Sequence, residues 1–100
     1  MNKNLFLVIR TRGPKWEDGR LLEQQEGWRP HADFMNALER QGFAIFAGPI
    51  VGTRDVLIVI RATDEQEIEA RLAEDPWTRS GQLQTKTVHR WNLRLGTIPG

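Results

Sequence analysis

The chain has 100 residues, of which 39% are hydrophobic and 27% are charged, and its formal net charge is +1. This length allows one domain, residues 1–100, with a real core, but not two domains. The small net charge argues against nucleic-acid binding by bulk electrostatics. The absence of cysteine excludes disulfides, thiol catalysis and Cys-ligated metals.

The first expected element is a strand over Leu5–Ile9, in which every residue is apolar. A strand without polar alternation is typical of one that is buried on both faces, so we expect it near the centre of a sheet. The run is shorter than a signal-peptide core and far shorter than a membrane span. We therefore expect a cytoplasmic protein with no membrane partner.

A polar segment over residues 15–29 follows and carries Trp16 and Trp28. It is long for a connection in so small a domain, and such loops are usually functional or mobile. The two tryptophans indicate that the loop packs back over the rest of the chain. They either pin the loop to the core or close it over a site, and the sequence leaves both possibilities open.

A helix is predicted to begin at Pro30, because proline suits the first helical position, and to stop at Gly42. One stripe of this helix collects its apolar residues at three- and four-residue spacing, together with one histidine. The members of the stripe are His31, Phe34, Met35 and Leu38.

A β-hairpin is predicted next, from two apolar runs at Phe43–Ala47 and Val56–Ile60. Glycine, proline and aspartate between the runs favour a turn. The second run is apolar at every position, which again predicts a strand buried on both faces.

The second helix is predicted to open at Asp64, which has the pattern of an N-cap residue followed three positions later by glutamate. Pro76 interrupts it and pushes Asp75 out of helical geometry. A short turn then runs to Gly81, and the alternating segment Leu83–Leu95 is predicted to be an edge strand.

The order β-α-β-β-α-β predicts an α+β protein with the ferredoxin-like fold. Right-handed crossovers place both helices on one face of a four-stranded antiparallel sheet. The other face is then bare and apolar, so we expect a homodimer that forms through it.

Candidate chemical groups are few. His31 is suited to act as a base near neutral pH, or else it only fills the helix stripe. Asp75 either caps the turn after Pro76 or orients a histidine. Considered alone, the residues favour the structural interpretation of both. No spaced cluster of His and carboxylate side chains offers a metal site, so we expect no metal and no cofactor.

Five segments in this order are informative together: Trp28–Met35, Leu38–Gly42, Gly48–Ile50, Asp75–Thr78 with Gly81, and Val88–Leu93. Together they resemble the YCII-related (YciI-like) family. The resemblance implies a dimeric α/β barrel of the ferredoxin-like superfamily, in which two sheets pack face to face. It also implies an active site made of one histidine and one aspartate, which fall on His31 and Asp75 here.

The first functional hypothesis is an enzyme in which His31 is the general acid or base and Asp75 orients it. The substrate is then a small molecule, aromatic or cyclic, and the reaction is proton abstraction, isomerisation or elimination of HX. Apolar walls for this substrate are expected from Phe34, Trp77, Trp91 and the loop residue Trp28.

The alternative hypothesis is a non-catalytic protein that binds a small molecule or haem, with His31 or His89 as ligand. A third possibility, an RNA-binding sheet, needs aromatic residues on the central strands. These strands are aliphatic, so we expect no nucleic-acid partner.

Overall fold

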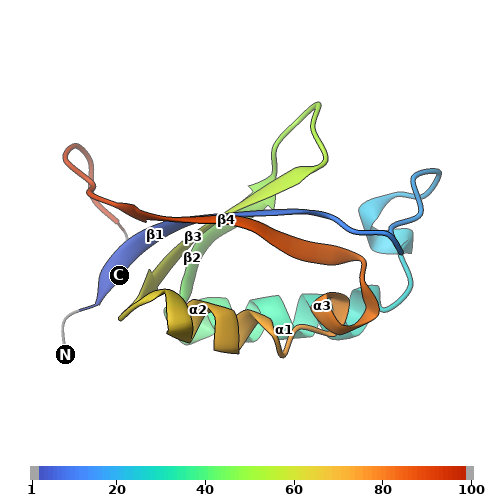
Figure 1. Cartoon of the computed structure of the whole chain (residues 1–100), viewed down its shortest axis with the longest axis horizontal. Helices are drawn as coiled ribbons and strands as arrows, with labels where there is room; N and C mark the ends of the chain where they lie inside the picture. The colour runs from blue at the N-terminus through green and yellow to red at the C-terminus, as the bar shows by residue number, and fades with distance from the viewer. Residues whose placement is uncertain (1–2, 99–100) are drawn as a thin grey trace.

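The computed structural model describes residues 3–98. The predicted order of elements is present (Figure 1). The short turn expected between Pro76 and Gly81 is a third helix, and a 3-10 turn precedes the first helix. The elements are β1 (Asn4–Arg12), η1 (Leu22–Gln24), α1 (Trp28–Arg40), β2 (Ala44–Pro49), β3 (Asp55–Ala62), α2 (Glu65–Leu72), α3 (Pro76–Ser80) and β4 (Leu83–Trp91).

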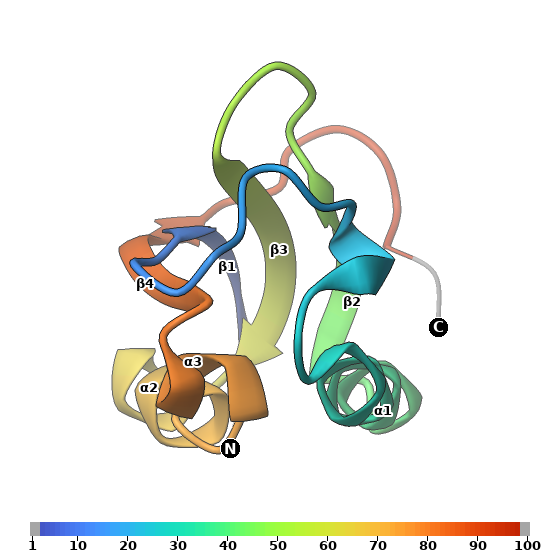
Figure 2. The ribbon, with the colours of Figure 1, turned by 90° about the vertical axis from the view of Figure 1, so that its right-hand side faces the viewer.

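The four strands form one antiparallel sheet in the order β2-β3-β1-β4. The two continuously apolar strands, β1 and β3, are central, and β2 and β4 are the edges. All three helices lie on one face of the sheet, with α2 and α3 beside α1 (Figures 1 and 2). The predicted α+β ferredoxin-like fold is therefore confirmed. No helix among residues 3–98 is long and apolar enough to cross a membrane.

The main core fills the space between the sheet and the helices. Alternate residues of each central strand point toward the helices, and the apolar stripes of α1 and α2 pack against them. Burying each large side chain contributes about 1.5–3 kcal/mol. The largest members of this cluster are Phe6, Val8, Leu38, Phe43, Ile58, Ile60, Ile68 and Leu72.

The outer face of the sheet is also apolar. The strand register pairs Leu7 with Val59 and Ile9 with Leu57 on this face. The edge-strand residue Phe46, opposite Val59, is 52% exposed. The helices lie on the other side of the sheet and leave this face uncovered (Figure 2).

The first helix begins two residues before the predicted start. Gly27 occupies the N-cap position with φ of 78°, and α1 starts at Trp28, so Pro30 is the third helical residue. Proline costs nothing there, because the first N–H groups of a helix have no intrahelical partner. His31 consequently lies one turn into the helix and donates its backbone N–H to the Gly27 carbonyl at 3.1 Å.

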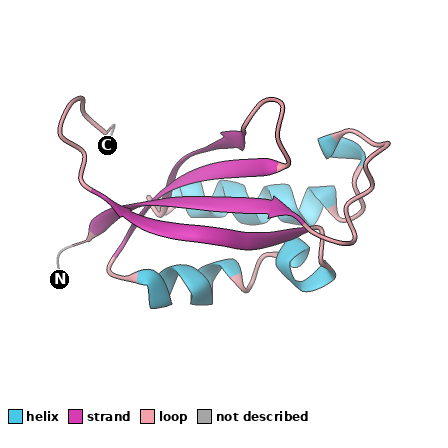
Figure 3. Ribbon diagram, turned by 45° about the horizontal axis from the view of Figure 1, so that its top comes forward, coloured by secondary structure: helices cyan, strands magenta, loops and turns pink. Residues whose placement is uncertain are grey.

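The last strand is shorter than predicted. It ends at Trp91 instead of Leu95. Its register against β1 shifts between Ile9 and Arg10, which interrupts the simple alternation of its side chains. The 3-10 turn and the start of α1 gather with α3 at one end of the sheet (Figure 3).

Candidate active site

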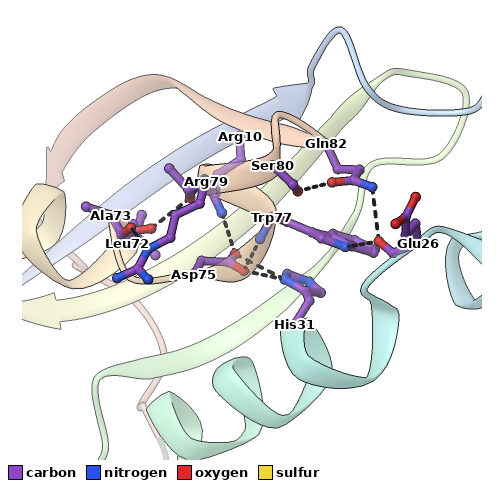
Figure 4. Close-up of polar contacts among 11 residues, drawn as sticks. Arg10, Glu26, His31, Leu72, Ala73, Asp75, Trp77, Arg79, Ser80 and Gln82 are labelled. Carbon is purple, nitrogen blue, oxygen red and sulfur yellow. Dashed lines mark hydrogen bonds and ion pairs between the residues drawn. The ribbon is translucent and has the colours of Figure 1, made fainter.

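A buried cluster of polar side chains lies at that end of the sheet (Figure 4). His31 comes from the second turn of α1, Asp75 from the junction between α2 and α3, and Arg10 from β1. The ring nitrogen Nδ1 of His31 lies 2.9 Å from Asp75 Oδ1 and 3.1 Å from Oδ2. His31 is 8% exposed and Asp75 is fully buried. The contact that a His-Asp pair requires is therefore present within one chain.

Asp75 also caps the short helix α3. Pro76 is the first residue of that helix, and Asp75 before it has extended φ and ψ of −63° and 125°. Its Oδ1 accepts the backbone N–H of Trp77 at 2.9 Å, and the same oxygen faces His31. Capping and histidine orientation are thus combined in one carboxylate, so the two interpretations offered by the sequence are not alternatives.

Arg10 is a third member of the cluster that the sequence analysis missed. Its Nη1 donates to Asp75 Oδ2 at 2.8 Å, and the side chain is 1% exposed. The available signal was strand alternation, because Phe6, Val8 and Arg10 share the face of β1 that points to the helices. A guanidinium on that face needs a buried anion, since burying an unpaired charge is costly.

The carboxyl of Asp75 is held in its ionised form. Burial works to raise its pKa, but hydrogen bonds from His31 and from the Trp77 N–H, together with the Arg10 charge, outweigh burial and lower the pKa below its ordinary value. An ionised carboxylate only accepts hydrogen bonds, so Nδ1 of His31 must carry the hydrogen. In the neutral ring the lone pair then lies on Nε2, the nitrogen that a base uses.

The imidazole is also fixed by an aromatic neighbour. The His31 and Trp77 rings are stacked, with centroids 3.9 Å apart and planes 8° apart. Trp77 is 1% exposed, and its Nε1 donates to the Glu26 carbonyl at 2.8 Å, so the indole has little freedom. Trp28 lies beside both rings, at centroid distances of 5.9 Å to His31 and 5.8 Å to Trp77.

A cavity of about 190 Å³ adjoins the histidine. Most of its wall is aromatic or aliphatic, and His31 and Arg10 are the polar side chains in it. The remaining lining residues are Trp16, Leu22, Trp28, Met35, Ala47, Gly48, Pro49, Val56, Ile58, Trp77 and Leu83.

Segment 13–28 forms one wall of this cavity through Trp16, Leu22 and Trp28. The segment is held next to the start of β4, because the N–H of Gly13 donates to the carbonyl of Gln82, the residue before that strand, at 2.8 Å. A β-carbon at Gly13 would overlap the Gly81 carbonyl, so only glycine permits this approach. Trp16 and Trp28 also belong to a second hydrophobic cluster with Trp77 and Leu83, so the loop tryptophans pin the loop to the core and line the cavity at the same time.

Two of the expected substrate-binding residues line the cavity and two do not. Trp28 and Trp77 face it. Phe34 instead packs against the main core. Trp91 pairs with Leu5 at the far end of β4, where it borders a separate, open depression. His89 pairs with Leu7 and is exposed, away from His31.

No group of three His, Asp or Glu side chains that could hold a metal ion is found within residues 3–98. The expectation that the protein needs no metal and no cofactor remains a prediction.

Comparison with curated proteins found no match, and comparison with solved structures found none either. The family model described as the YCII-related domain matches residues 5–92. Apart from Asn4, the first residue of β1, this match spans the four strands and three helices, and it includes both His31 and Asp75. The chain therefore belongs to the YCII-related domain family.

Proposed function

We propose that this protein is a small-molecule enzyme that uses general acid/base catalysis. His31 is the catalytic base through Nε2, and the same group returns the proton as an acid. Asp75 orients the ring. The observation that carries the proposal is the 2.9 Å contact between His31 Nδ1 and a fully buried carboxylate, beside an apolar cavity. Orientation of a base by a buried carboxylate is a recurrent catalytic arrangement.

The cavity suits a compact, uncharged substrate with a flat face. A cavity of roughly 150 Å³ is enough to hold benzene, so about 190 Å³ accommodates one ring with a few substituent atoms. Trp28 and Trp77 offer flat walls for such a ring. The Arg10 and Asp75 charges cancel each other, so a charged substrate has no opposite charge to pair with while His31 is neutral.

The reaction begins when Nε2 removes a proton from an acidic C–H or O–H of the bound ring. The resulting imidazolium is stabilised by the Asp75 carboxylate and by the face of Trp77. In an isomerisation the same proton returns to a different atom. In an elimination the C–H electron pair forms the new double bond as halide leaves, and His31 then releases its proton to water.

A second copy of the chain is proposed to cover the outer face of the sheet. The exposed or half-buried apolar residues on that face support this homodimer, because an open apolar sheet face is unfavourable in water. The proposed site lies on the opposite, helix-bearing side, so one copy contains both His31 and Asp75.

The enzymatic proposal is tested by screening lactones, hydroxyquinones and chlorinated aromatics for turnover. His31→Gln is the test variant, and His89→Gln is the control because His89 is exposed in the single chain and distant from Asp75. His89 pairs with Leu7 on the outer face, so light scattering must show the wild-type mass for this control. Loss of general base catalysis is expected to lower the rate about 10²- to 10⁴-fold in the first variant and to leave it unchanged in the second. If compounds bind both variants equally and wild type turns none over, the non-catalytic binding hypothesis is favoured.

A further inference from the structure

We infer that Arg10 is a positioning residue that sets the tautomer of His31 by acting through Asp75. It keeps the carboxylate anionic and correctly placed, so the imidazole keeps its hydrogen on Nδ1 and its lone pair on Nε2. The inference rests on the proposed function, because it concerns the same base. Its test measures the protonated nitrogen of the His31 ring and does not need turnover. The inference and the proposed function can therefore fail separately.

Both terminal nitrogens of the Arg10 guanidinium are held by hydrogen bonds. Nη1 donates to Asp75 Oδ2 at 2.8 Å, and Nη2 donates to the Thr78 hydroxyl. That hydroxyl in turn donates to the Leu72 carbonyl at 2.7 Å, so its lone pairs are available to Arg10. The side chain thus joins the end of α2, the start of α3 and the carboxylate in one arrangement.

Three donors surround the Asp75 carboxylate. Oδ1 receives the Trp77 N–H and is the nearer oxygen to His31 Nδ1, at 2.9 Å. Oδ2 receives the guanidinium and lies 3.1 Å from the same Nδ1. Of these three donors only Arg10 always brings a positive charge, because a neutral His31 and a backbone amide carry none. Arg10 therefore places a permanent positive charge beside a carboxylate with no exposed surface.

Loss of this charge reverses the hydrogen bond. A buried carboxylate without compensation takes up a proton, because burial favours its neutral form. A protonated carboxyl then donates to the ring instead of accepting from it. Nδ1 of His31 must then accept this hydrogen bond, so the neutral ring carries its hydrogen on Nε2. Nε2, the nitrogen proposed as the base, no longer has a free lone pair.

Lysine is a poor substitute for this arginine. Its ammonium is a point charge, whereas the guanidinium serves Asp75 and Thr78 through two separate nitrogens in a fixed fork. The Nε of Arg10 is buried and has no hydrogen-bond partner within the described part of the chain. The terminal nitrogens therefore hold the side chain, and Arg10→Lys is expected to restore the charge but only part of the positioning.

The test is nitrogen NMR of protein labelled with ¹⁵N-histidine, which reads the tautomer of each ring directly. The chain has two histidines, so His89→Gln assigns the signals. The test variant is Arg10→Met. The matched control is Arg12→Met, from the same strand, since Arg12 stacks over Trp16 at 4.7 Å and has no hydrogen bond or ion pair to Asp75 or His31.

We expect the Nδ1–H form of His31 in wild type and in Arg12→Met. In Arg10→Met the ratio of Nδ1–H to Nε2–H should fall about tenfold or more, the scale of one lost charge-assisted hydrogen bond. An Nε2–H ring in wild type overturns the inference, and so does an unchanged ratio in folded Arg10→Met. If that variant does not fold, Arg10→Gln decides, because glutamine also lacks the charge but can still donate a hydrogen bond in the buried site: a reduced ratio supports the inference and a wild-type ratio overturns it.

Discussion

The imidazole of His31 lies parallel to the indole of Trp77, with ring centroids 3.9 Å apart and planes 8° apart. The pair spans two elements, since His31 belongs to α1 and Trp77 is the second residue of α3. The backbone N–H of Trp77 donates to the same Asp75 oxygen that faces His31. One tryptophan therefore fixes both the carboxylate and the plane of the ring that the carboxylate orients.

Replacing Trp77 is expected to affect stability and catalysis together. Trp77→Leu removes a fully packed ring and should lower the free energy of unfolding by about 3 kcal/mol. It also removes the aromatic face over the imidazolium, so turnover should fall about tenfold. Trp77→Phe keeps an aromatic ring and loses the bond to Glu26, so both effects should be smaller. Denaturant unfolding and steady-state kinetics measure them, and equal turnover in Phe and Leu variants would contradict the stacking role.

Asp75→Asn is expected to separate the two functions of this residue. Asparagine caps a helix about as well as aspartate, so α3 should persist. The Arg10 charge is then buried without an anion, which should cost about 3 kcal/mol of stability. Activity should be lost as well, because a neutral amide does not fix the tautomer of His31. Circular dichroism, denaturant unfolding and turnover check the three parts, and a variant with full activity would contradict the orienting role.

Stability should fall in acid in a way that depends on Asp75. Its pKa is lowered in the folded chain, so the stability it contributes is present above its unfolded pKa, about 4, and is lost as pH falls through the folded value. The half-buried groups Asp55 and Glu67 also have lowered pKa values, through hydrogen bonds from the Thr11 side chain and the Thr63 backbone respectively. Below about pH 4, the free energy of unfolding should therefore fall less steeply with falling pH in Asp75→Asn than in wild type. Some loss should remain, because Asp55 and Glu67 still titrate in the variant. An identical pH profile in the variant would contradict this assignment.

Two neighbouring residues of β3 test the proposed dimer. Ile58 points toward the helices and is 1% exposed, whereas Leu57 lies on the outer face opposite Ile9. Ile58→Lys should prevent folding, because it buries a charge in the core. Leu57→Lys should leave the fold intact and shift the dimer toward monomer. Light scattering of wild type should give twice the chain mass of 11.5 kDa, and a monomer at micromolar concentration would contradict the dimer.

Local sequence pattern was sufficient to predict the fold. Continuous apolar runs at Leu5–Ile9 and Val56–Ile60 correctly indicated the two central strands, because such runs are typical of strands in the middle of a sheet. The cover that they predict for the outer face stays a prediction. The start of α1 was wrong because Gly27, in a left-handed conformation, begins the helix before Pro30. A proline is compatible with any position in the first turn, so it does not locate the first residue.

The site was less accessible from sequence. His31 and Asp75 are 44 positions apart, and no local pattern connects them, so their pairing depended on the family resemblance. Arg10 lies outside the apolar run, which predicts that the strand ends at Ile9. In the structure β1 continues to Arg12, and strand alternation points the Arg10 side chain to the same inward face as Phe6 and Val8. Trp91 lies eight residues beyond Leu83, roughly 26 Å along the strand, which explains why it does not reach the cavity.

The central claim is that Nε2 of His31 removes a proton from a ring bound in the cavity. Its most direct measurement is deuterium exchange from D₂O into the acidic C–H positions of unsaturated lactones, followed by NMR, because exchange reports proton removal without net reaction. The account predicts exchange catalysed by wild type and His89→Gln and at least about 100-fold slower exchange with His31→Gln. Equal exchange rates in His31→Gln and wild type would contradict it.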